Sequence, residues 1–268
     1  MAVGPRTIAV VGASGKTGQA IAASLASRGA AVVPVGRRQW PALADSFAGC
    51  EAVSIVAPNL HPDEPGLVGQ VLTAAESAGV ARVVYHSVAA PYAPAMPHHL
   101  GKARAEDVVR RSPFSWTILQ PCAYVQNLVP ALRSGTPYLE VPYAVDRPFG
   151  LVDLLDLAEA TARVLLDEGH AGATYELGGP ALVSVSDAAA AASSVLGRRV
   201  LARRQDPESW ASGPGAGLAP RERAWLLAMF ASYDRHGLPA GGRVLRDLLG
   251  GRSTSLDETL TRELAAAG

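Results

Sequence analysis

The sequence predicts an α/β protein with a doubly wound parallel sheet, followed by a small and mostly helical C-terminal region. An apolar, β-branched run over residues 7–11 leads directly into a glycine-rich turn and a helix-forming segment. Strand and helix patterns then alternate as far as Pro121, which is typical of parallel sheets with helices on both faces. Beyond Pro121 the patterns are mostly helical, so we expect a second region there.

Length and composition place the chain among globular proteins. Its 268 residues suffice for one large domain, or one domain with a small appendage, and 49% of them are hydrophobic. The 24 basic and 24 acidic residues cancel, which argues against a general electrostatic grip on nucleic acid. Two cysteines are too few for a disulfide framework or a cysteine-rich metal site. With no signal-peptide pattern and no membrane-length apolar run, we expect a cytoplasmic protein without metal, nucleic-acid or membrane partners.

The elements of the first region are bounded by local signals. The expected strands are Ile8–Val11, Ala31–Val35, Ala52–Val56, Arg82–Ser87 and Ser115–Leu119. The expected helices are Lys16–Arg28, Gly66–Ala78 and His99–Arg111. Gly29 and Gly79 follow two of these helices as C-terminal stop signals.

The second region carries its own start and stop signals. The expected elements are helices at Tyr124–Leu132, Asp153–Glu168, Asp187–Leu196 and Pro220–His236, and a short strand at Thr174–Leu177. We expect Ser186 to cap the helix that Gly197 ends. Residues 255–258 have the pattern of a capping box that opens a last helix.

The glycine turn is the clearest functional signal. Gly12 lets the turn close, Gly15 lets the backbone approach phosphates, and Gly18 lets helix and strand pack closely. Unpaired amides and the positive end of the helix dipole favour an anion there, so we expect a Rossmann-type domain that binds the pyrophosphate of a dinucleotide. A P-loop is disfavoured, because Val10 stands where that motif needs a glycine.

Two arginines predict which dinucleotide is bound. NAD-binding domains usually place an acidic side chain about 20 residues beyond the glycine turn. Here Arg37 and Arg38 follow the second strand and suit a 2′-phosphate, so we expect NADP(H) in preference to NAD(H). Ligands of such sheets bind at the carboxyl ends of the strands. The expected cofactor-binding residues are Gly12, Ser14, Gly15, Lys16, Thr17, Gly18, Arg37, Arg38, Ala57, Pro58, Ser87, Lys102 and Pro121.

The candidate catalytic residues are Lys102, Ser87, His98, Tyr92 and Tyr124. Lys102 begins the helix after Ser87 and can orient a nicotinamide ribose or lower the pKa of a neighbouring acid. A solvated basic face is the alternative for Lys102, because three arginines lie nearby in the sequence. Each of the two tyrosines can supply a proton or simply pack as an aromatic ring, and both interpretations stay open.

With these residues in place, the chain resembles the NmrA-like branch of the atypical short-chain dehydrogenase/reductases. The matching segments are Gly12-x-x-Gly15-x-x-Gly18, Val84–Ser87, His98-x-x-x-Lys102, Thr117–Pro121, Val152-Asp153-x-x-Asp156 and Tyr175–Pro180. The resemblance covers nearly the whole chain. It implies a dinucleotide-binding domain over residues 1–121 and a substrate or lid region over 122–268, of which about residues 150–180 return to the core.

The chain departs from this family at two places. His98 stands where related reductases carry a tyrosine, four residues before the lysine. Only 16 residues, 36–51, separate the second and third strands, where the family usually fits a helix, a strand and another helix. We therefore expect a sheet shortened by one αβ unit after the second strand.

The resemblance and the residues together lead to three functional hypotheses. The first is an NADPH-dependent reductase of a small carbonyl, quinone or imine compound of secondary metabolism. Such an enzyme is compatible with a homo-oligomeric assembly. In it, Ser87 hydrogen-bonds the substrate oxygen, and Tyr92, His98 or Tyr124 donates the proton. The second is an NADP(H)-binding redox sensor or regulatory protein without turnover. The third is a non-redox enzyme of the cyclase or dehydratase type on the same scaffold.

Overall fold

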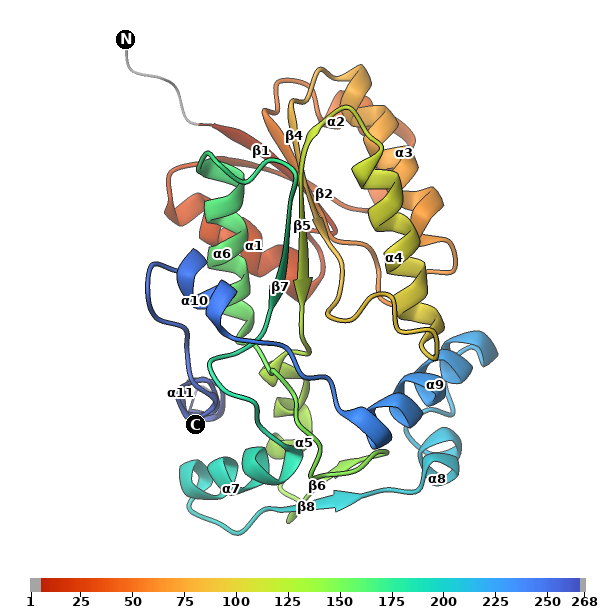
Figure 1. Cartoon of the computed structure of the whole chain (residues 1–268), viewed down its shortest axis with the longest axis vertical. Helices are drawn as coiled ribbons and strands as arrows, with labels where there is room; N and C mark the ends of the chain where they lie inside the picture. Colours follow the sequence, from red (N-terminus) through yellow and green to blue (C-terminus); the bar gives the residue numbers. More distant parts are fainter. Residues whose placement is uncertain (1–5, 266–268) are drawn as a thin grey trace. The chain divides into compact units, whose positions relative to one another are not determined.

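The computed structural model describes residues 6–265, and its main sheet has six strands in the order β2-β1-β3-β4-β5-β7 (Figure 1). These strands are β1 (Thr7–Val11), β2 (Ala31–Val35), β3 (Ala52–Ile55), β4 (Arg82–His86), β5 (Ser115–Pro121) and β7 (Ala173–Leu177). The pairs β1–β2, β1–β3, β3–β4 and β4–β5 are parallel. The chain leaves β1 for both neighbours in turn, so the expected doubly wound α/β fold is confirmed.

Helices cover both faces of this sheet. They are α1 (Lys16–Ser27), α2 (Leu43–Ser46), α3 (Glu64–Ser77), α4 (Pro97–Arg110) and α6 (Leu154–Leu166). In Figure 1, α1 and α6 lie on one face, and α3 and α4 on the other. Ser24 of α1 and Arg28, the C-cap residue that follows it, both donate to Glu159 of α6 at 3.0 Å, which links α1 to α6. Phe47 and Tyr85 are fully buried in the core of the opposite face.

The sheet is shortened after β2, as expected. Between β2 and β3 the chain forms only a 3₁₀ segment, η1 (Arg37–Ala42), and the four-residue helix α2. Sixteen residues leave no room for another crossover and strand, and Pro41 inside η1 interrupts regular helical hydrogen bonding. β2 is consequently an edge strand, and Ala31 and Pro34 are exposed.

The described residues divide into two compact units. The first comprises the residues up to Tyr92, His99–Pro121 and Leu155–Tyr175. The second comprises Ala93–His98, Cys122–Leu154 and the chain from Glu176 onward.

The second unit has a small parallel sheet and a helical core of its own. Its elements are η2 (Val125–Asn127), α5 (Val129–Arg133), β6 (Tyr138–Val141), α7 (Val185–Leu196), β8 (Leu201–Arg204), α8 (Pro207–Ser212), α9 (Pro220–His236), α10 (Arg243–Leu248) and α11 (Leu256–Ala265). β6 pairs with β8, and Leu132, Leu139 and Leu260 are buried in one apolar cluster. Buried Asp153 accepts hydrogen bonds from Thr259 at 2.7 Å and Arg262 at 2.5 Å, which ties α11 to the segment that precedes α6.

Two sequence predictions in this unit are wrong in detail. Ser184, not Ser186, caps α7: its hydroxyl accepts from the Asp187 amide at 3.1 Å, and the Asp187 carboxylate accepts from the Ser184 amide at 2.8 Å. Ser186 donates instead to the Val145 carbonyl. The expected helix Tyr124–Leu132 is split into η2 and α5, because Pro130 lacks an amide hydrogen and fits only the first turn of a new helix.

Four predicted helix termini in the second unit are confirmed. Gly197 ends α7 in the left-handed conformation. Ser255 and Glu258 form the predicted capping box of α11, with the Ser255 amide 2.9 Å from the Glu258 carboxylate. α9 spans the predicted residues 220–236.

Candidate cofactor and active site

The corner between β1 and α1 is built from backbone. Gly12 has φ +82°, and a Cβ there would lie 2.3 Å from the Val56 carbonyl oxygen, beside the end of β3. Its amide donates to Val35 at the end of β2, at 2.9 Å. A Cβ on Gly18 would lie 2.3 Å from the Gly12 carbonyl oxygen. The fold itself therefore demands glycine at both positions.

Gly15 differs from these two glycines. A Cβ there would meet only the Gly12 oxygen, at an ordinary 3.5 Å, and its φ of −84° suits any residue. Gly15 is exposed and is the N-cap of α1, which has no side-chain cap and no acidic residue in its first turn. Nothing in the protein's own packing requires glycine here, whereas a phosphate approaching the helix N-terminus does. The corner therefore fits a dinucleotide.

The other expected cofactor residues lie at the carboxyl ends of the neighbouring strands. Exposed Arg37 and Arg38 begin η1 directly after β2. Within residues 6–265 neither guanidinium forms an ion pair or a side-chain hydrogen bond, so both are available to a ligand phosphate. The others are exposed Ser14 and Lys16 with buried Thr17 at the α1 corner, half-buried Ala57 and exposed Pro58 after β3, and buried Pro121 at the end of β5.

Lys102 does not lie on a solvated basic face. Its ammonium donates to Glu64 Oε1 at 2.7 Å and to the His86 carbonyl at 3.2 Å. The side chains of Lys102 and Glu64 are 11% and 1% exposed. Tyr85 donates its hydroxyl to the same Glu64 oxygen at 2.7 Å. The amine predicted from sequence is thus held in a buried cluster beside the end of β4.

Ser87 is hydrogen-bonded to a buried carboxylate, that of Glu106. Its hydroxyl donates to Glu106 Oε1 at 2.5 Å, and Gln120 donates to the same oxygen at 2.8 Å. Arg110 reaches the other oxygen at 3.3 Å, so the Glu106 carboxylate is compensated although fully buried. Since the one Ser87 proton points to Glu106, the Ser87 oxygen is left to accept a hydrogen bond rather than donate one. This differs from a serine that donates to a substrate oxygen.

Burial keeps two histidines of this region neutral. His86 stands between Tyr85 and Ser87 in the sequence, and burial, aided by the charge of Lys102, lowers its pKa to about 3. Within the described residues neither ring nitrogen of His86 has a hydrogen-bond partner. Burial lowers the pKa of His99 to about 4, and its ring pairs with the Ala90 carbonyl at 3.2 Å. Neither imidazole is therefore charged at neutral pH, so neither can act as a general acid.

The three expected proton donors belong to two different units. Tyr92 belongs to the first unit and is 63% exposed, on the loop after β4. His98 and Tyr124 belong to the second unit. His98 is buried in the first turn of α4 and stacks on Trp225, with ring centroids 6.4 Å apart. Tyr124 is half-buried, precedes η2 and bridges to Val152.

Sequence reasoning missed Glu64 and Glu106. Glu106 follows Lys102 by four residues and precedes Arg110 by four, so all three share one face of α4. That spacing is the only local sign that Glu106 belongs to the cluster. Glu64 is 38 residues from its lysine, and nothing near it in the sequence marks it as buried.

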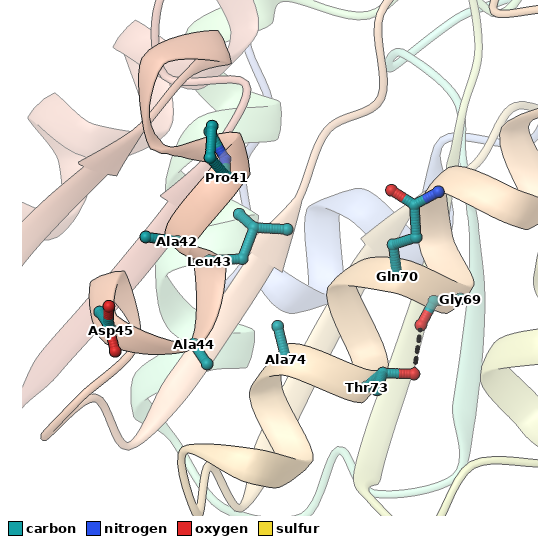
Figure 2. Close-up of a pocket in the computed structure, with 9 residues that line it drawn as sticks. All are labelled: Pro41, Ala42, Leu43, Ala44, Asp45, Gly69, Gln70, Thr73 and Ala74. Carbon is teal, nitrogen blue, oxygen red and sulfur yellow. Dashed lines mark hydrogen bonds between the residues drawn. The ribbon is translucent and has the colours of Figure 1, made fainter.

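A surface pocket of about 640 Å³ lies elsewhere in the first unit. Figure 2 shows its wall of small and apolar side chains from η1, α2 and α3, including Leu43 and Ala74. Two of its polar side chains are already engaged: Thr73 donates to the Gly69 carbonyl, and Gln70 accepts from Trp40. The described lining contains no histidine, tyrosine, cysteine or basic residue, so the pocket lacks the groups that a reduction requires.

Within residues 6–265, no group of histidine, cysteine, aspartate and glutamate side chains is arranged to hold a metal ion. None of the helices in that range is long and apolar enough to cross a membrane.

Comparison with known proteins places this geometry in a family. The NmrA-like family matches residues 24–212. An NAD(P)H azoreductase of Xenophilus azovorans is 30% identical over 185 residues, which are 67% of this chain and 63%, less than two thirds, of that protein.

Solved structures show the same fold. An Escherichia coli NADPH-dependent quinone oxidoreductase complexed with NADPH has a TM-score of 0.82 at 21% identity, covering 96% of this chain and 99% of that one. NmrA, a negative transcriptional regulator in complex with NAD, has a TM-score of 0.78 at 18% identity, covering 99% of both chains. Because the family match spans most of the chain, and NAD(P)H-dependent oxidoreductases are among its relatives, the protein belongs to the NmrA-like family.

Proposed function

We propose that the protein is an NADPH-dependent reductase of a small quinone, carbonyl or imine compound. The observation that carries the proposal is the β1–α1 corner, where exposed Gly15 opens an uncapped helix and no packing contact requires a glycine. The 30% sequence identity to an NAD(P)H azoreductase supports reduction as the activity.

The proposal gives each group of residues a task. The amides at Gly15–Gly18 hold the pyrophosphate, and Arg37 and Arg38 hold the 2′-phosphate, so that NADPH binds better than NADH. Ala57, Pro58 and Pro121 line the cofactor at the ends of β3 and β5.

The remaining groups act at the nicotinamide end. When bound, the cofactor supplies a hydride to the substrate. Lys102 donates a hydrogen bond to the ribose next to the nicotinamide, and the Ser87 oxygen accepts one from an N–H or O–H donor. A tyrosine, Tyr92 or Tyr124, donates the proton that balances the hydride, because His98 is buried against Trp225.

The test combines binding and turnover. NADPH and NADH are titrated against the purified protein by fluorescence, and NADPH oxidation is then followed with quinones, ketones, imines and azo dyes. We expect tighter binding of NADPH and turnover of at least one compound class. In the variant Arg37→Ala/Arg38→Ala, the preference for NADPH over NADH should fall about tenfold or more, as expected for lost charge-assisted hydrogen bonds. An unchanged preference would refute the role of the two arginines.

A second candidate is a dinucleotide sensor without turnover. The buried position of His98, stacked on Trp225 where related reductases carry a tyrosine, favours it. Tight NADPH binding with no oxidation by any compound of the panel would support the sensor. Absence of binding would instead support a non-redox enzyme on this scaffold.

A further inference from the structure

The Glu64–Lys102 pair joins two elements that the sequence keeps apart. Glu64 is the first residue of α3, and Lys102 lies in the second turn of α4. Their charged atoms are 2.7 Å apart, and the carboxylate side chain is almost fully buried. A buried carboxylate is unfavourable unless a cation compensates it, so the two residues constrain each other.

The hydrogen bonds of this pair use two of the three N–H groups of the Lys102 ammonium. A lysine ammonium has three N–H groups. One points to Glu64 Oε1 and one to the His86 carbonyl, and within the described residues the third has no acceptor. Tyr85 binds the same Glu64 oxygen from the side of β4, so the carboxylate is itself fixed. The remaining N–H therefore has a defined direction, which a free lysine on its flexible stem would lack.

We propose that Glu64 is a positioning residue, which holds the Lys102 ammonium ready to donate this third hydrogen bond to the nicotinamide-side ribose of NADPH. The inference rests on the proposed function, because it presumes that NADPH binds at the end of β4. Glu64 itself touches no ligand in this scheme. Its effect on the cofactor passes entirely through Lys102.

A double-mutant cycle tests this dependence. The variants are Glu64→Gln, Lys102→Met, the two combined, and Glu76→Gln as a matched control that removes an exposed carboxylate from the same helix. The readouts are the Kd of NADPH by fluorescence titration, KM and kcat for NADPH, and the thermal unfolding midpoint of each variant.

The expected pattern is non-additive. Glu64→Gln alone should raise the Kd of NADPH about fivefold and Lys102→Met about tenfold, while the combined variant should match Lys102→Met to within about twofold. KM should follow Kd with little change in kcat, because the ribose contact is made in both ground and transition states. Glu76→Gln should bind NADPH like the wild type.

Each outcome has a definite meaning. If Glu64→Gln leaves the Kd unchanged, or raises it equally with and without Lys102, the positioning role is wrong. If Glu64→Gln does not fold, the combined variant, which leaves no unpaired buried charge, still decides: a Kd well above that of Lys102→Met overturns the inference. If the wild type itself does not bind NADPH, the proposed function fails, and this inference fails with it.

Discussion

Two corners of the same sheet obtain their polar character in different ways. At the β1–α1 corner the polar groups are backbone amides, and no side chain caps the helix. At the β4–α4 corner they are buried side chains: Glu64 pairs with Lys102, and Glu106 accepts a hydrogen bond from Ser87. A corner made of backbone fails when atoms are added, whereas a corner made of buried charges fails when a charge is removed.

Adding one methyl group at Gly12 should have the largest effect. In Gly12→Ala the Cβ would lie 2.3 Å from the Val56 carbonyl oxygen, at φ +82°. The clash and the backbone strain together should lower the free energy of unfolding by about 3 kcal/mol or more. Gly29→Ala is the control, because Gly29 has a similar φ of +81° but no atom within 4 Å of the position that a Cβ would take.

In urea unfolding, Gly29→Ala should lose only about 1 kcal/mol, the cost of the left-handed backbone alone. Equal losses in the two variants would mean that the close approach to β3 contributes nothing.

Removing one charge at Glu106 should have the next largest effect. Glu106→Gln keeps the shape but places an amide N–H group against Arg110 or Ser87, so one buried donor loses its acceptor. The free energy of unfolding should fall by about 2 kcal/mol. Asp107→Asn is the neighbouring control, because its pair with Arg111 is exposed and screened by solvent, so the free energy of unfolding should change far less. A loss at Asp107 as large as that at Glu106 would contradict the role of burial.

Acid should weaken the β4–α4 corner through His86. Its pKa is about 3 in the folded protein and 6.5 when exposed, so only the unfolded chain takes up its proton as the pH falls below 6.5. The contribution of neutral His86 to the free energy of unfolding is therefore fully present above pH 6.5. It is lost as the pH falls toward 3, at about 1.4 kcal/mol per pH unit for this one group. The variant His86→Leu loses no side-chain hydrogen bond among the described residues. Between pH 6 and about pH 4, its free energy of unfolding should fall with pH less steeply than that of the wild type, by that amount per pH unit. Equal slopes would mean that His86 is not held neutral.

The contrast also explains what could be predicted from the sequence. The β1–α1 corner was predictable, because Gly12, Gly15 and Gly18 lie within seven residues and their spacing alone implies the turn. The cap of α7 was misplaced by two residues, since Ser184 and Ser186 are both good caps and only the contact with Val145 separates them. Short-range signals therefore fix an element and leave its end uncertain.

The β4–α4 corner was only half predictable. Lys102 and Ser87 follow a predicted strand, but Glu64 and Glu106 join them from 38 and 19 residues away. The sequence around a single glutamate does not show whether its side chain is buried or solvated, because burial depends on which helices pack together. The strands β6 and β8 were missed for the same reason: each has four residues, and Glu140 pairs with Arg203 across 63 positions.

The smallest effect on stability, and the sharpest test of the comparison, is expected at Gly15. In Gly15→Ala the new Cβ meets one atom at 3.5 Å and φ is ordinary, so the free energy of unfolding should fall by less than about 1 kcal/mol, the difference between glycine and alanine as N-caps. The Kd of NADPH should nevertheless rise about tenfold or more, because the methyl group occupies the approach of a phosphate to the α1 amides. Fluorescence titration and urea unfolding of the same preparation separate the two effects. If Gly15→Ala bound NADPH as tightly as the wild type, the backbone corner would be a feature of packing alone, and the β4–α4 side chains would have to account for any cofactor binding.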